Sequence, residues 1–167
     1  MGLFDFLKGN KKEEKTNFTL HSTSNGEVVA LEKVDDPVFS QKMMGDGYAI
    51  EPEDGEIYSS VTGTIKSVFP TKHALGIELE NGQELLLHIG IDTVELEGEP
   101  FTNHVKEGEK VTPQTLLTTV DLKALDAADK GKTIMVVFPE AESVENITIE
   151  KKGHVAGGEE IGTIAFK

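Results

Sequence analysis

The sequence contains no cysteine and no run of 18 apolar residues. The absence of cysteine excludes disulfides, cysteine-ligated zinc and a cysteine nucleophile, and it is typical of cytoplasmic proteins. The absence of a long apolar run and of a signal-peptide pattern argues against a membrane-spanning or secreted chain. A length of 167 residues suits one domain with a sizeable core, so we expect a cytoplasmic single-domain protein.

Positive charge is also scarce, because 16 Lys and Arg residues stand against 30 Asp and Glu residues and the formal net charge is −14. A nucleic-acid partner is not expected, since no basic patch is present to bind phosphates. The acidity favours solubility, and it also suits basic protein partners. Nothing in the sequence requires an oligomer, so we expect a monomer.

The first 17 residues differ from the rest of the chain. They hold apolar side chains at near-helical spacing, followed by lysines: Leu3, Phe4, Phe6 and Leu7, then Lys8, Lys11, Lys12 and Lys15. Acidic residues dilute this positive charge, so we favour a flexible leader over residues 1–17. The alternative is an amphipathic segment with weak contact to an anionic membrane. Residues 18–167 then form the folded domain, which we interpret as a free-standing protein rather than a piece of a longer chain.

From Phe18 onward, turn-forming residues recur at the short intervals typical of an all-β protein. Short apolar runs alternate with Gly, Pro, Asn and Asp, which predicts an antiparallel β-sandwich or barrel. Two pairs of similar short segments indicate that the domain consists of two related halves. Residues 24–28 resemble residues 61–65, and residues 105–111 resemble residues 155–161.

A few regular elements can be placed individually. One short helix is predicted from Asp121, which would cap it, to Lys130, with Gly131 ending it. Further strands are predicted at Thr133–Phe138 and Asn146–Glu150.

A β-hairpin is predicted where Asn81-Gly82 separates two apolar-rich runs, because both residues tolerate a positive φ. A two-residue loop would place His88 opposite Leu75 and His73 opposite Gly90. The two histidines would then be diagonal neighbours on one face of the sheet, with Cβ atoms about 7–8 Å apart or less.

Two histidines that meet in this way are either ordinary half-buried residues or a functional pair. The residues around His88 favour function. On the face opposite to His88, four apolar side chains would anchor the strand: Leu85, Leu87, Ile89 and Ile91. A rigid, partly desolvated imidazole is a good nucleophile near pH 7, because its ordinary pKa is about 6.5.

At this point the chain resembles a known family. The stretch Gly82-Gln-Glu-Leu-Leu-Leu-His88-Ile-Gly-Ile-Asp-Thr-Val94 resembles the phosphohistidine signature of the glucose-type enzyme IIA of the bacterial phosphoenolpyruvate-dependent sugar phosphotransferase system. Thr71-Lys-His73 resembles the family's second histidine and its orienting threonine, and residues 36–50 are similar to another family block. The similarity begins around Phe18 and reaches the C-terminus. The start of the chain, Met1-Gly-Leu-Phe-Asp-Phe, resembles the leader of free-standing members.

This resemblance implies an antiparallel β-sandwich with short helices that acts as a phosphocarrier. It implies that His88 takes a phosphoryl group from phosphorylated HPr and passes it to the cysteine of a sugar-specific enzyme IIB domain. His73 would donate a hydrogen bond to a phosphoryl oxygen, and Thr71 would bond the other nitrogen of His73 and fix its tautomer. Such a transfer requires no cofactor. Regulatory proteins are a further class of partner that the resemblance allows.

An apolar docking surface with an acidic rim is expected around the histidines. Its candidate residues are Val38, Phe39, Met44, Phe69 and Leu86, with Asp36 and Asp92 at the rim. Phe39 and Phe69 could instead be core residues, and Asp92 could cap a turn. The other histidines, His21, His104 and His154, are predicted to be surface residues without a special role.

Two other classes of protein fit parts of the pattern. His73, His88 and Asp92 could supply three ligands of a zinc hydrolase, although the chain lacks the His-x-His pair of related zinc peptidases. The two histidines could also bind zinc weakly, with a partner adding a third ligand. A swinging-arm carrier of the biotinyl or lipoyl type shares the spacing of residues 105–111, but it needs a lysine at a hairpin tip and Lys123 lies in the predicted helix.

Overall fold

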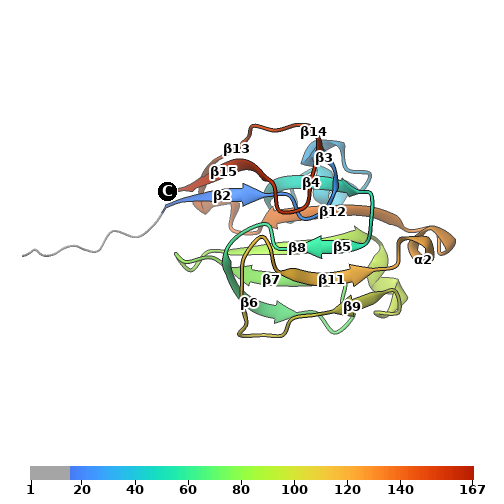
Figure 1. Cartoon of the computed structure of the whole chain (residues 1–167). Helices are drawn as coiled ribbons and strands as arrows, with labels where there is room; N and C mark the ends of the chain where they lie inside the picture. The colour runs from blue at the N-terminus through green and yellow to red at the C-terminus, as the bar shows by residue number, and fades with distance from the viewer. Residues whose placement is uncertain (1–15) are drawn as a thin grey trace, which may run out of the picture.

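A computed structural model describes residues 16–167, and the predicted leader lies outside the described residues except for its last two positions. The described chain consists of antiparallel strands and a few short helices, which confirms the predicted fold class (Figure 1). The domain begins slightly before the predicted boundary. Strand β2 starts at Asn17, and the carbonyl of Thr16 accepts a hydrogen bond from the amide of Phe166. None of the helices described is long and apolar enough to cross a membrane.

The strands form three sheets. The largest has the strand order β10-β6-β7-β8-β12-β4-β3-β14. Along the chain these strands are β3 (Gly26–Ala30), β4 (Asp46–Pro52), β6 (Gly63–Val68), β7 (Ala74–Glu78), β8 (Glu84–Ile91), β10 (Lys110–Val111), β12 (Gly131–Phe138) and β14 (Gly153–Val155). One small sheet contains β5 (Glu56–Tyr58), β11 (Leu116–Val120) and β9 (Phe101–Asn103), and the other contains β13 (Val144–Ile149), β15 (Glu160–Phe166) and β2 (Asn17–His21). The predicted strands at residues 133–138 and 146–150 correspond to β12 and β13.

The helical segments are short. They are α1 (Pro37–Ser40), α2 (Leu122–Ala127) and the 3-10 turns η1 (Leu31–Lys33), η2 (Thr93–Leu96) and η3 (Ala141–Ser143). The side chain of Asp121 caps α2 as predicted, by accepting a hydrogen bond from the amide of Ala124. The helix ends at Ala127 rather than at Lys130, and Asp129 adopts a left-handed φ of 60° that a helix cannot accommodate. Helix α1 was not predicted, although Asp36-Pro37 is a typical helix start.

The predicted similarity between residues 105–111 and 155–161 corresponds to two turns of the same construction. Glu109 Oε1 accepts a hydrogen bond from the amide of Lys106, and Glu159 Oε1 accepts one from the amide of Ala156, both at 2.9 Å. The glycines within the two turns, Gly108 and Gly158, both have positive φ. This equivalence supports two related halves.

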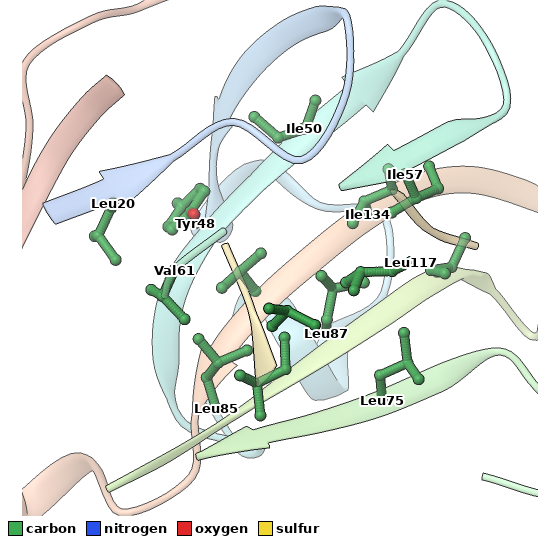
Figure 2. Close-up of a cluster of buried hydrophobic side chains, with 14 of the residues drawn as sticks. Leu20, Tyr48, Ile50, Ile57, Val61, Leu75, Leu85, Leu87, Leu117 and Ile134 are labelled. Carbon is green, nitrogen blue, oxygen red and sulfur yellow. The ribbon is translucent and has the colours of Figure 1, made fainter. Parts of the chain in front are cut away.

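The main hydrophobic core joins the three sheets (Figure 2). Leu87 and Ile50 come from the large sheet, Ile57 and Leu117 from one small sheet, and Leu20 from the other, and all five are completely buried. Burial of each such side chain contributes about 1.5–3 kcal/mol. This packing holds β8 rigidly from its inner face.

The outer face of β8 packs on a second, smaller cluster. Its buried members are Leu31, Val34, Phe39, Ala49, Met135 and Val137. The predicted alternation along β8 is confirmed for Leu85, Leu87 and Ile89, which are buried in the main core. It is wrong for Ile91, which packs against the second cluster instead. Gly90 has a φ of 84° and pairing with β12 is irregular there, so the alternation of faces reverses.

The hairpin before β8 has a longer turn than predicted. The amide of Leu79 donates to the carbonyl of Gln83, which leaves a three-residue loop that ends with Gly82 at a φ of 87°. The register is therefore shifted by one residue, and His88 lies opposite Ala74 instead of Leu75. A shift of one residue exchanges the two faces of a strand.

Candidate functional site

The two histidines meet beside a turn, in a register that differs by one residue from the predicted pairing. The carbonyl of His73 accepts a hydrogen bond from the amide of Ile89 at 2.7 Å. Lys72 has a left-handed φ of 64°, and its amide donates to the carbonyl of Phe69, so the chain bends immediately before β7. This bend brings His73 to the side of His88. Their ring centroids lie 4.9 Å apart with an interplanar angle of 78°. The expected proximity is confirmed, while the expected register is wrong.

His73 is fixed by two neighbours in its own turn. The hydroxyl oxygen of Thr71 lies 2.7 Å from its Nδ1, which is the contact that the family resemblance implied. The ring of Phe69 meets it edge-on at 5.7 Å. Burial lowers the pKa of His73, and a hydrogen bond with the Thr71 backbone opposes this shift only in part. The imidazole is therefore neutral near pH 7.

His88 is held by its own strand and by an aromatic side chain from α1. Its Nδ1 lies 3.0 Å from the carbonyl oxygen of Gly90, and the ring of Phe39 lies 4.9 Å away at 57°. Burial, reinforced by the nearby His73, lowers the pKa of His88 to about 4, although the Gly90 carbonyl and the charge of Asp92 oppose the shift. His88 is therefore neutral at physiological pH.

The contact with Gly90 determines the tautomer of His88. A carbonyl oxygen only accepts hydrogen bonds, so Nδ1 carries the proton and Nε2 keeps its lone pair. Glycine is needed at this position, because a Cβ there would lie 2.4 Å from Cγ2 of Thr93 and 2.8 Å from the carbonyl oxygen of Gly131. The hydroxyl of Thr93 in turn donates to the carbonyl of Ile89 at 2.6 Å. Backbone geometry thus presents one nucleophilic nitrogen.

Phe69, whose ring contacts His73, is one of several exposed apolar side chains. Among residues 16–167 the exposed large apolar side chains are Val38, Met43, Met44, Phe69 and Val94. Val38, Met44 and Phe69 were predicted at a docking surface, and all three are exposed. Met43 and Val94 are also exposed but were not among the predicted residues, although Met43 is adjacent to Met44 and Val94 is the last residue of the histidine motif. Leu86 is half-buried against the second cluster.

The prediction that Phe39 is an exposed docking residue is wrong. Its side chain is only 5% exposed, against 70% for Met43, and it belongs to the second cluster. Its ring packs against His88 rather than facing solvent. The alternative of a core residue is therefore the correct one for Phe39 and not for Phe69.

The two predicted rim carboxylates differ in their surroundings. Asp36 is half-buried, and its Oδ1 accepts a hydrogen bond from the amide of Val38 at 2.9 Å, which caps α1. Asp92 is exposed, and its side chain does not cap η2 as the alternative proposed. Its negative charge lies close enough to raise the pKa of His88 against the effect of burial.

A three-ligand zinc site is not formed. Among the described residues no group of three or more His, Cys, Asp or Glu side chains is placed to hold a metal ion. The Nδ1 atoms of His73 and His88 already have polar neighbours, so only their Nε2 atoms remain as ligands. Zinc would need further ligands from a partner. Lys123 lies within α2 and not at a hairpin tip, which removes the swinging-arm alternative.

Within the described residues the other three histidines make no ring contact with this pair, and two of them contact other polar side chains. His104 and His154 are exposed, as predicted. Nε2 of His104 lies 2.7 Å from the hydroxyl of Thr119, and Nε2 of His154 lies 2.8 Å from a carboxylate oxygen of Glu53. The prediction is wrong for His21, which is half-buried, and burial lowers the pKa of His21.

Residues 18–144 match the family described as phosphoenolpyruvate-dependent sugar phosphotransferase system, EIIA 1. Among curated relatives, a glucose-specific EIIA component of the phosphotransferase system from Oceanobacillus iheyensis is 41% identical over 149 residues, which cover 89% of this chain and 90% of that one. A glucose-specific EIICBA component from Streptococcus pneumoniae is 54% identical over 137 residues. That match covers 82% of this chain but only 19% of the longer relative.

A solved structure has the same fold. Glucose permease IIA from Mycoplasma capricolum superposes with a TM-score of 0.77 at 34% sequence identity. The superposition covers 91% of this chain and 98% of that one.

Proposed function

The chain belongs to the EIIA 1 family of the phosphoenolpyruvate-dependent sugar phosphotransferase system, and we propose that it carries the phosphoryl group on Nε2 of His88. The observation that carries this proposal is the hydrogen bond between Nδ1 of His88 and the carbonyl of Gly90. It leaves a lone pair on Nε2 of a ring that burial keeps neutral. A neutral imidazole nitrogen is a competent nucleophile toward phosphorus.

Phosphorylated HPr is the proposed donor. The lone pair of His88 Nε2 attacks phosphorus, a new N–P bond forms, and the bond between phosphorus and the donor's nitrogen breaks with its electron pair returning to the donor. The ring of His88 then bears substituents on both nitrogens and gains positive charge. The Gly90 carbonyl, 3.0 Å from Nδ1, stabilises that charge by accepting a stronger hydrogen bond.

His73 has a different role in this proposal. Its ring lies 4.9 Å from that of His88, so a phosphoryl group on His88 comes within reach of it. Thr71 would donate to Nδ1 of His73, which places the ring proton on Nε2 for a hydrogen bond to a phosphoryl oxygen. Transfer of this kind depends on positioning and charge stabilisation more than on acid–base chemistry.

The proposed acceptor is the cysteine of an enzyme IIB domain. Its thiolate attacks phosphorus, an S–P bond forms, and the electron pair of the N–P bond returns to Nε2 of His88. The name of the Streptococcus pneumoniae relative, EIICBA, combines an A unit with B and C units in one protein, which supports this acceptor. The names of the relatives reported above all contain glucose, so glucose is the first sugar to test.

The exposed apolar side chains beside the histidines form the proposed docking surface for both partners. Asp36 and Asp92 flank it, and the net charge of −14 favours basic residues on the donor. We place this exchange in the cytoplasm, with the protein as a monomer. The transfer needs no cofactor, and a zinc ion held by His73 and His88 would depend on ligands from a bound partner.

Transfer of labelled phosphate tests these roles separately. The chain is mixed with labelled phosphoenolpyruvate, enzyme I and HPr, and then with a glucose-specific enzyme IIB domain. His88→Ala is expected to abolish labelling, whereas His73→Ala still accepts label but passes it on at least about tenfold more slowly. His104→Ala, a change at an exposed histidine, serves as the matched control. Labelling of His88→Ala at the normal level would overturn the proposal.

A further inference from the structure

Two phenylalanines each contact one histidine of the site, but they differ in burial. Phe69 lies against His73 and is 38% exposed, so a partner can reach it. Phe39 lies against His88 and is 5% exposed, so a partner can reach almost none of it. A contribution of Phe39 to the reaction must therefore act through the ring of His88.

Phe39 is held firmly by its own helix and by the second cluster. Helix α1 begins at Pro37, whose ring fixes the backbone for a first helical position, and the carboxylate of Asp36 caps that helix. The Phe39 side chain packs in the second cluster, which includes Met135 and Val137 of β12. Met135 is also the residue paired with His88 across the two strands. Phe39 is thus a rigid wall rather than an adaptable contact.

The ring of His88 is confined on several sides at once. His73 meets it at 78° and Phe39 at 57°, both with centroids 4.9 Å away. The carbonyl of Gly90 binds Nδ1. A half-turn about the bond between Cβ and Cγ would exchange Nδ1 with a carbon atom and break that hydrogen bond. Nε2 would then move from its present position, and water would compete for both nitrogens.

We propose that Phe39 is a positioning residue that holds the His88 imidazole in the single orientation that pairs Nδ1 with Gly90 and leaves Nε2 free to react. This inference rests on the proposed function of His88. Removal of the Phe39 ring opens the site to water and permits the half-turn. The charged and titratable groups that act on His88 are His73 and Asp92. Phe39 carries no charge, so its replacement leaves both unchanged and alters only packing and hydration.

NMR of the full chain labelled with ¹⁵N in histidine tests the inference without any phosphoryl transfer. In the wild-type protein the ring nitrogens of His88 are expected to show one tautomer with the proton on Nδ1. In Phe39→Leu, the fraction of that tautomer is expected to fall and the pKa of His88 to rise by about one unit or more, because water reaches the ring. Phe39→Met is the second variant, since it also removes the ring but its flexible side chain can fill the cluster in a different way from leucine.

Phe69→Leu is the matched control, because it removes the equivalent ring beside His73. It is expected to leave the tautomer and pKa of His88 unchanged and to raise the KM for phosphorylated HPr. The Phe39 variants are expected to lower the rate at saturating donor at least about tenfold with little change in KM. A Phe39 variant with unchanged His88 tautomer and pKa overturns the inference. A normal NMR response with no phosphorylation of wild-type His88 contradicts only the proposed function.

Discussion

The hydroxyl oxygen of Thr71 lies 2.7 Å from Nδ1 of His73, across a turn in which Lys72 has a left-handed φ of 64°. A hydroxyl that donates this hydrogen bond leaves the ring proton of neutral His73 on Nε2. The same ring faces His88 at a centroid distance of 4.9 Å. In the proposed function, this turn would set which nitrogen of His73 donates to a phosphoryl group on His88.

Replacement of Thr71 by valine is expected to affect the second transfer more than the first. Thr71→Val keeps the shape but loses the hydroxyl that lies 2.7 Å from Nδ1 of His73 and would orient its ring in the proposed function. We expect phosphate uptake from HPr to remain within about threefold of normal, and transfer to enzyme IIB to slow by about ten- to a hundredfold. Single-turnover labelling measures both rates.

Thr119→Val is the matched control for this change, because Thr119 makes the same kind of 2.7 Å contact with His104 at an exposed position. It is expected to leave both rates unchanged. Equal onward transfer by Thr71→Val and wild type would rule out the orienting role of Thr71.

The pH dependence of phosphate uptake follows from the pKa of His88. Protonation of Nε2 removes the lone pair, so only the neutral ring reacts. Because the pKa of His88 is lowered to about 4, the neutral form persists when the pH falls from 8 to about 5 and is lost as the pH approaches 4. An imidazole with the ordinary pKa of about 6.5 would already be half protonated at pH 6.5. Titration of the His88 ring signals by NMR measures the midpoint, and a midpoint near 6.5 would contradict the account.

Substitution of the two glycines of the hairpin is expected to lower the free energy of unfolding by different amounts. Gly90 and Gly82 have φ of 84° and 87°, but a Cβ would clash with Thr93 and Gly131 only at Gly90. Gly90→Ala is expected to lower the free energy of unfolding by about 3 kcal/mol, and Gly82→Ala by about 1 kcal/mol. Urea unfolding of both variants provides the comparison. Equal losses would show that crowding at Gly90 has no energetic weight.

Substitution of Met43 tests whether the exposed apolar side chains bind phosphorylated HPr. Met43→Ser removes an apolar side chain that is 70% exposed, so stability should hardly change. We expect the KM for phosphorylated HPr to rise about tenfold, which corresponds to about 1.4 kcal/mol of lost apolar contact. Glu145→Ser, at an exposed position of β13 in the small sheet, is the control and should leave this KM unchanged. An unaltered KM in Met43→Ser would exclude Met43 from the docking surface.

The sequence predicts most of what depends on local pattern. The contact between Thr71 and His73 is what the family resemblance implies, while the all-β class and the capped start of α2 come from residues close together in the chain. The hairpin register does not, because Asn81-Gly82 is compatible with both a two-residue and a three-residue loop. The left-handed turn at Lys72 and the hydrogen bond from the amide of Ile89 to the carbonyl of His73 place the two histidines together despite the changed register.

The burial of Phe39 also lies beyond local pattern. A single aromatic residue after Asp-Pro has no periodicity that distinguishes core from surface. Its neighbours in the second cluster come from η1 and β4, which are near in the chain, and from β8 and β12, which are distant and pair only in the folded sheet. Met43 and Met44 illustrate the same point, because both are apolar and adjacent yet only packing determines how exposed each one is.

The central claim is that Nε2 of His88 carries the phosphoryl group. NMR of the histidine-¹⁵N-labelled chain after incubation with phosphoenolpyruvate, enzyme I and HPr tests it most directly, since a bound phosphorus splits the signal of the nitrogen that holds it. The account predicts this splitting on Nε2 of His88, its absence in His88→Ala and its loss after acid treatment. Splitting on Nδ1, phosphate on another residue, or no phosphate in the presence of active HPr would contradict the account.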